Sequence, residues 1–82
     1  MVSGFVYVLS MNNGKYYVGS TNDLERRIVQ HQKGYVKATK LYVPIGLLYS
    51  KKYDTIKEAR QVEYLLKKQK DRKQIEKFMQ GF

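Results

Sequence analysis

The sequence contains no cysteine, a single histidine, a single proline and only seven acidic residues. Without cysteine, neither disulfides nor a thiolate zinc site can hold the fold, and a reducing compartment is compatible. No apolar run approaches the ~20 residues that a membrane span requires. The apolar stretch from Phe5 to Leu9 is too short for a secretory signal and lacks a basic flank. We therefore expect a cytoplasmic protein that does not contact a membrane.

Positive charge is what the chain has in excess. Sixteen Lys and Arg face seven Asp and Glu, which gives a net charge of +9 over 82 residues. This imbalance implies a polyanionic partner, because basic side chains that neutralise phosphates release counterions. Hydrophobic residues make up 43% of the chain and aromatic residues 13%, which is too much for a disordered segment. The length predicts one domain over residues 1–82.

Turn and capping signals divide the chain into elements. Runs of β-branched and aromatic residues predict strands at 5–9, 15–19 and 45–53. Three pairs at capping-box spacing predict helices from about 23 to 33, from 55 to about 69, and from 71 to near 78. These pairs are Asn22 with Glu25, Thr55 with Glu58, and Asp71 with Gln74. The order β-β-α-β-α-α predicts an α/β (α+β) domain on a three-stranded, mostly antiparallel sheet.

The register of the first hairpin stays open at this level. A two-residue Asn13-Gly14 turn would put Tyr7 and Tyr17 on opposite faces of the sheet. A three-residue loop with Gly14 in the left-handed region would put both tyrosines on one face, with Tyr7 opposite Gly19. A strand glycine such as Gly19 often marks the close approach of another group, although it also suits a strand that ends in a turn.

The helix at 23–33 places two polar side chains at the border of its apolar face. Arg27 and His31 are four residues apart and lie beside Leu24, whereas Arg26 points to solvent. A partly buried guanidinium is costly unless an anion meets it. Arginine is also well shaped to hold a phosphate at two points.

Glu63 lies at the border of the apolar stripe of the following helix. A carboxylate there can hold Mg²⁺, which proteins often bind through one or two carboxylates with water and substrate phosphate. The alternatives are purely structural. Glu63 could form a helix pair with Lys67 or Arg60, and Arg27 could pair with Glu63 or Asp54.

The order of these residues resembles the GIY-YIG endonuclease superfamily. The first motif reads Phe-Val-Tyr and the second Tyr-Val-Gly, and an acidic residue follows on a later helix. The similarity covers nearly the whole chain, and it includes the small stand-alone, single-domain members and, more distantly, the nuclease domain of excinuclease. The residues that carry it are Tyr7, the pattern Tyr17-x-Gly19-x4-Leu24-x2-Arg27-x3-His31, and Glu63.

The resemblance implies a DNA endonuclease that uses one divalent ion, Mg²⁺ or Mn²⁺, held by Glu63. Arg27 would stabilise the scissile phosphate. Tyr17, or alternatively Tyr7, would accept a proton from the attacking water, and His31 would orient that tyrosine. Both tyrosines reach one site only with the three-residue loop, so the resemblance selects that register. Structure-selective substrates of the repair and recombination type are the expectation.

The chain departs from the family pattern at two places. Many relatives have a lysine where this chain has Ser20, and some have an asparagine after the metal-binding acid, where this chain has none. Lys67 or Lys70 could substitute as a phosphate contact.

A basic loop at 33–40 is the candidate surface for gripping the strand by charge and stacking. The alternative is a solvated surface loop. Because 82 residues leave little surface for reading bases, a protein partner could supply specificity. Two other functions compete with catalysis: a nucleic-acid-binding module that does not cut, and a weak interaction domain. The candidate loop contacts are Lys33, Tyr35, Lys37, Thr39 and Lys40.

Overall fold

The computed structural model describes residues 3–69 and 71–81. The predicted order of elements is confirmed, with one additional short 3-10 helix, η1, before the third strand. Among the described residues, no helix is long and apolar enough to cross a membrane. The elements are β1 (Gly4–Ser10), β2 (Tyr16–Thr21), α1 (Leu24–Gln32), η1 (Lys40–Tyr42), β3 (Gly46–Tyr53), α2 (Ile56–Gln69) and α3 (Arg72–Met79).

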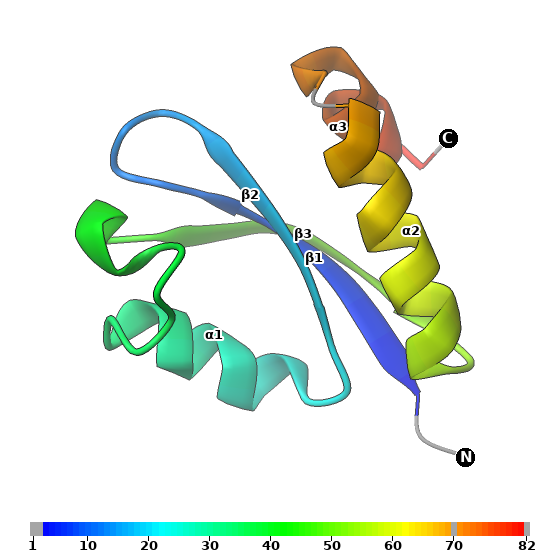
Figure 1. Ribbon diagram of the computed structural model, residues 1–82, viewed down its shortest axis with the longest axis horizontal. Coiled ribbons are helices and arrows are strands. Elements are labelled where there is room, and N and C mark those ends of the chain that lie inside the picture. Colours follow the sequence, from blue (N-terminus) through cyan, green and yellow to red (C-terminus); the bar gives the residue numbers. More distant parts are fainter. Residues whose placement is uncertain (1–2, 70, 82) are drawn as a thin grey trace.

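The three strands form one sheet in the order β2-β1-β3, and both neighbouring pairs are antiparallel. Figure 1 shows α1 on one side of this sheet and α2 with α3 on the other. Successive side chains of a strand point to opposite faces, so β1 supplies two separate apolar clusters. The cluster under α2 and α3 contains Val6, Val8, Val18, Ala59, Leu66 and Phe78. The cluster on the α1 side contains Tyr7, Leu9 and Ile45, with Leu24 and Ile28 packed against it.

The hairpin between β1 and β2 has the register that the resemblance selects. Leu9 pairs with Tyr17, and Tyr7 pairs with Gly19. Gly14 adopts a φ of 80°, in the left-handed region, and its backbone N–H donates to the carbonyl of Met11 at 2.9 Å. The three-residue loop is therefore confirmed, and it puts both tyrosines on the α1 face.

Gly19 is required by the close approach of Tyr7. A Cβ built at Gly19 would overlap the hydroxyl and Cζ of Tyr7, and it would lie 2.9 Å from Cε2 of the same ring. The Tyr7 side chain therefore crosses over β2 at the one position where β2 has no side chain. This contact confirms the close approach that a strand glycine indicates.

The first helix begins one residue later than predicted. Asp23, not Asn22, is the N-cap, and its side chain accepts a hydrogen bond from the backbone N–H of Arg26 at 3.1 Å. The reason lies just before the helix, where the Thr21 hydroxyl accepts from the Asp23 N–H at 3.1 Å and keeps Asp23 extended. The predicted Thr55 cap is confirmed, since its hydroxyl accepts from the Glu58 N–H at 3.2 Å.

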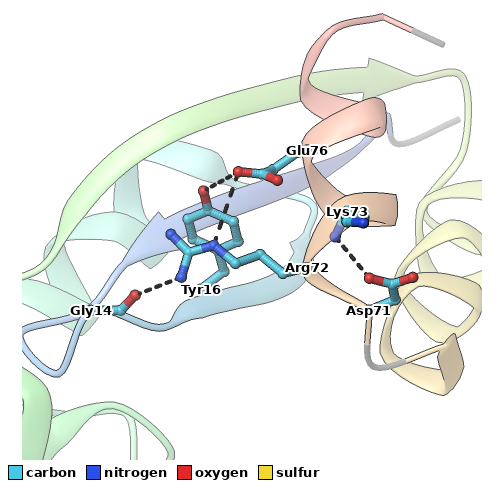
Figure 2. A network of polar contacts seen from close by, with 6 residues as sticks. All are labelled: Gly14, Tyr16, Asp71, Arg72, Lys73 and Glu76. Atoms are coloured by element: carbon cyan, nitrogen blue, oxygen red, sulfur yellow. Dashed lines mark hydrogen bonds and ion pairs between the residues drawn. The ribbon is translucent and has the colours of Figure 1, made fainter.

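A polar network ties α3 to the hairpin (Figure 2). The Arg72 guanidinium lies 4.2 Å from the centre of the Tyr16 ring and donates to the carbonyl of Gly14 at 3.1 Å. The Tyr16 hydroxyl in turn donates to Glu76 at 3.1 Å. Asp71 caps α3 by accepting from the backbone N–H of Lys73 at 2.9 Å. The C-terminal helix is thereby fixed against β2.

We predict that Gly19→Ala destabilises the fold and displaces Tyr7. The added methyl overlaps the Tyr7 ring, and forcing an extra carbon into a packed site costs about 1–3 kcal/mol. Urea unfolding should show the loss. Gly46→Ala is the matched control, because its Cβ would meet only the Ser10 hydroxyl, at 3.1 Å. Equal stability of the two variants would contradict the proposed contact.

Candidate active site

The residues that the sequence singles out meet along the free edge of β2. Tyr17 and Gly19 face α1, whereas Ser20, the next residue along, faces α2. The Ser20 hydroxyl donates a short hydrogen bond to Glu63 of α2. The Lys67 ammonium, also from α2, lies 5.0 Å from the centre of the Tyr17 ring. Because β2 is an edge strand, side chains from the two faces of the sheet come together there.

A buried chain of polar groups lies on the α1 side of this edge. The Tyr7 hydroxyl and Nε2 of His31 are 2.9 Å apart, and Nδ1 of His31 lies 2.7 Å from the Thr39 hydroxyl. Tyr7 is 1% exposed, and His31 and Thr39 are 0% exposed. Tyr17 packs edge-on against His31, with ring centres 5.2 Å apart. His31 therefore contacts both tyrosines, and its ring hydrogen bond goes to Tyr7.

The position of Thr39 makes one sequence prediction wrong. The basic loop predicts that Thr39 contacts nucleic acid, but its side chain is fully buried and hydrogen-bonded to His31. The loop folds back onto α1, where the Tyr35 N–H donates to the carbonyl of Gln30 at 2.9 Å. Nothing in the local sequence indicates that this threonine faces inward.

Burial and the charge of Arg27 set the protonation of the buried chain. Burial lowers the pKa of His31 from 6.5 to about 4, and the nearby Arg27 charge acts in the same direction. His31 is therefore neutral at pH 7, so one ring nitrogen donates and the other accepts. Burial also raises the pKa of Tyr7; its interaction with Arg27 opposes this rise, and the charges of Tyr17 and Glu63 add to it.

Arg27 is partly buried and has no carboxylate partner among the described residues. Its Nη1 donates to the side-chain oxygen of Gln30 at 3.1 Å, one turn further along α1. The predicted alternative, an ion pair with Glu63 or Asp54, is thus absent from the described part of the chain. The spacing of three residues could have indicated the contact with Gln30. The remaining guanidinium N–H groups can meet an external anion.

Glu63 lies across the β2 edge from Arg27. One oxygen is 2.7 Å from the Lys67 ammonium, so the predicted helix pair is present, and the other oxygen accepts the Ser20 hydroxyl. The Glu63 side chain is 22% exposed. Ser20, which replaces the lysine of many relatives, thus contacts the candidate metal ligand. The sequence gives no sign of this bond because it joins residues 43 positions apart.

The donor set at Glu63 fits a magnesium-type ion. No group of three or more His, Cys, Asp or Glu that could hold a metal occurs within residues 3–69 and 71–81. A single carboxylate nevertheless suits Mg²⁺, which keeps several waters and takes further oxygens from a substrate phosphate. The Lys67 ammonium on Glu63 shows that positive charge is already accommodated at this carboxylate.

The other predicted nucleic-acid contacts are mostly on the surface. Lys33 and Tyr35 line a surface pocket of about 480 Å³, which they share with Arg26 and Gln30 of α1. Lys67 lies at the β2 edge, and Lys70 falls outside the described residues. The side chains of the basic loop that are exposed are Lys33, Tyr35, Lys37 and Lys40.

Comparison with known proteins agrees with this geometry. The model of the GIY-YIG catalytic domain matches residues 3–76, so the chain belongs to the GIY-YIG family, which supports a nuclease-type function acting on nucleic acid. Its relatives include the UPF0213 protein of Streptococcus pneumoniae serotype 4, which is 38% identical over 92% of this chain and 76% of its own length. The UPF0213 protein of Staphylococcus saprophyticus is 32% identical over 94% of this chain and 95% of its own.

A solved structure has the same fold. The solution NMR structure of a UPF0213 protein from Bacillus halodurans aligns with a TM-score of 0.58 at 31% identity. It covers 93% of this chain, and the alignment spans 81% of that protein. The three-stranded antiparallel sheet with three α-helices is therefore shared with this relative.

We predict that Thr39→Val destabilises the protein although it conserves the shape of the side chain. The substitution removes the hydroxyl that meets Nδ1 of His31, and a buried polar atom left without a partner costs about 1–3 kcal/mol. Urea unfolding measures the loss. Thr39→Ser keeps the hydroxyl and should retain more stability than Thr39→Val; the reverse order would contradict a role for the hydrogen bond.

The neutral state of His31 predicts that acid destabilises the fold. Between the ordinary pKa of 6.5 and the folded value of about 4, the unfolded chain binds more protons, so stability rises with pH. Lowering the pH from 7 to 4 should remove on the order of 3 kcal/mol through this group. Urea unfolding of the wild type and of His31→Gln, compared at each pH, separates this effect from carboxylate titration. Parallel pH curves for the two proteins would show that His31 contributes nothing.

Proposed function

We propose that this chain is a divalent-metal-dependent endonuclease that hydrolyses DNA phosphodiesters, with structure-selective substrates of the repair or recombination type. The activity would reside in a single domain over residues 1–82. The observation that supports it is the meeting of two sets of side chains at the β2 edge: Tyr7, Tyr17, Arg27 and His31 from the α1 side, and Glu63 from the α2 side.

Arg27 would hold the scissile phosphate. Its guanidinium carries a positive charge that is not neutralised by any described carboxylate, and Gln30 fixes its orientation. Preorganised charge of this kind stabilises the negative charge that accumulates on phosphate oxygens as the water attacks. Since the guanidinium needs no movement to do so, the stabilisation costs no reorganisation during the reaction.

Tyr17 would accept the proton of the attacking water. It is partly buried and borders a pocket of about 380 Å³, whereas the Tyr7 side chain is 1% exposed and cannot easily meet water. His31 packs against the Tyr17 ring and is hydrogen-bonded to Tyr7. We therefore assign His31 and Tyr7 to positioning Tyr17. As the water oxygen bonds to phosphorus, the bond to the leaving oxygen breaks.

Glu63 would hold one Mg²⁺ or Mn²⁺ ion together with water and substrate oxygens. When bound, such an ion offsets the negative charge that develops on the leaving oxygen. The Lys67 ammonium, which pairs with Glu63 in the free protein, would then be available to contact a phosphate.

A second candidate function is nucleic-acid binding without cleavage, with specificity supplied by a protein partner. The pairing of Glu63 with both Lys67 and Ser20 favours it, because these contacts occupy the carboxylate. Arg27 speaks against it, since a scaffold gains nothing from a partly buried guanidinium without a carboxylate partner. Cytoplasmic location stays a prediction.

We predict that Glu63→Ala abolishes metal-dependent cleavage while DNA affinity stays nearly intact. Plasmid, single strand, flap and four-way junction should be offered with Mg²⁺ or Mn²⁺. Glu58→Gln on the same helix is the control, because Glu58 is exposed and contacts only the Thr55 cap; it should cut like the wild type. If the wild type binds these substrates and cuts none of them, the binding function replaces the nuclease.

Arg27→Ala should slow cleavage by about 10²–10³-fold, the usual cost of removing one preorganised group that stabilises developing charge. Single-turnover cleavage of the best substrate in the same panel measures the effect. Arg72→Ala removes the same charge from the α3 network at the other end of β2. A loss of chemistry as large as that of Arg27→Ala would show that the effect is not specific to the phosphate site.

A further inference from the structure

A pocket of about 310 Å³ opens at the end of β2, between the first turns of α1 and α2. Its walls bring together three guanidinium groups, those of Arg26 and Arg27 from α1 and Arg60 from α2. Helix spacing sets Arg26 apart from Arg27, because the two side chains leave α1 in different directions. Arg26 is exposed as predicted, yet it lines the same pocket, since the pocket extends around the start of the helix.

The positive charge of this pocket is largely unopposed. No described carboxylate lies within ion-pair distance of any of the three guanidinium groups. The one acidic residue in the lining is Asp23, and its side chain accepts from the backbone N–H of Arg26 as the cap of α1. Three like charges around one cavity repel one another. An anion that enters the cavity removes this repulsion and gains charge-assisted hydrogen bonds.

The pocket adjoins the proposed active site on two sides. Arg27 belongs to both, and Ser20, which lines the pocket, donates its hydroxyl to Glu63. A nucleic-acid strand with one phosphate between Arg27 and Glu63 would thus bring its next phosphate to Arg26 and Arg60. The planar guanidinium fork matches phosphate oxygens at two points, so two such groups can hold one phosphate firmly.

We propose that this arginine pocket, formed by Arg26, Arg27 and Arg60, binds the phosphate next to the scissile one on the same DNA strand. The proposal rests on the proposed nuclease function for the position of the scissile phosphate. Arg26 and Arg60 hold the neighbouring phosphate, while Arg27 faces both. The pocket therefore sets which phosphate enters the active site, and the strand runs along the β2 edge.

Binding without cleavage tests the pocket directly. A fluorescein-labelled single-stranded DNA oligonucleotide is titrated in EDTA at several salt concentrations, with fluorescence anisotropy as the readout. For single strands the logarithm of the binding constant falls with the logarithm of salt by about 0.7 for each neutralised phosphate. Arg60→Gln and Arg26→Gln should each reduce this slope and weaken binding several-fold at low salt.

Lys52→Gln supplies the matched control. It removes one exposed positive charge from β3, the opposite edge of the sheet, and should leave the slope as in the wild type. Circular dichroism verifies that the variants are folded. If Arg26→Gln and Arg60→Gln retain the wild-type slope, or lose no more than Lys52→Gln, the arginine pocket is not a phosphate site.

A neutral phosphate then locates the contact. In the best substrate, one methylphosphonate is placed next to the cut position. It should slow the wild type several-fold but add little to the defect of Arg60→Gln, because both changes remove the same contact. Equal, additive losses overturn the assignment to the neighbouring phosphate. If no substrate is cut but the salt slopes differ as expected, the nuclease proposal fails and the pocket stands as a DNA phosphate site.

Discussion

The packing of the Tyr7 ring over Gly19 is the contact on which the rest of the site depends. Tyr7 belongs to the central strand, and its side chain reaches the edge of the sheet only because its cross-strand neighbour has no Cβ. From there its hydroxyl meets His31, which in turn contacts Tyr17 and Thr39. The left-handed conformation of Gly14 sets the register that makes Tyr7 and Gly19 partners. One turn residue therefore aligns side chains from three separate elements.

The edge position of β2 explains how residues from both faces of the sheet share one site. A central strand would be flanked by neighbours, and its two faces would stay about a full sheet thickness apart. Along β2 the outer side is free, so Lys67 can approach the Tyr17 ring from α2 while His31 approaches it from α1. The Arg72 network holds α3 against the same strand (Figure 2). The edge that would otherwise be open to pairing with other chains is occupied by side chains of the site.

The elements of the fold could be predicted because their signals are local. The run Phe5–Leu9, the turn before Lys15 and the Thr55 cap are each readable within a few residues. The hairpin register could not be read locally, since both loop lengths suit the sequence, and only the resemblance to a family selected it. Local signals also gave the wrong cap for α1, where Thr21 and Asp23 compete with Asn22. The candidate site was likewise predictable in its residue types but not in its contacts. The bond from Ser20 to Glu63, the burial of Thr39 and the approach of Arg60 to Arg26 join segments that are far apart or fold back on themselves, so no periodicity indicates them.

Arg27 and Glu63 stay apart, and their separation leaves both charges available to a ligand. The two side chains act on the same tyrosine, Tyr7, with opposite effects on its pKa, yet no ion pair joins them in the described part of the chain. A direct pair would neutralise both groups and leave neither for a ligand. Because they approach the β2 edge from opposite faces, Arg27 is held by a neutral amide and Glu63 by a cation and a hydroxyl. A phosphate on the guanidinium and a metal ion on the carboxylate would satisfy both charges at once, which neither group achieves within the protein alone.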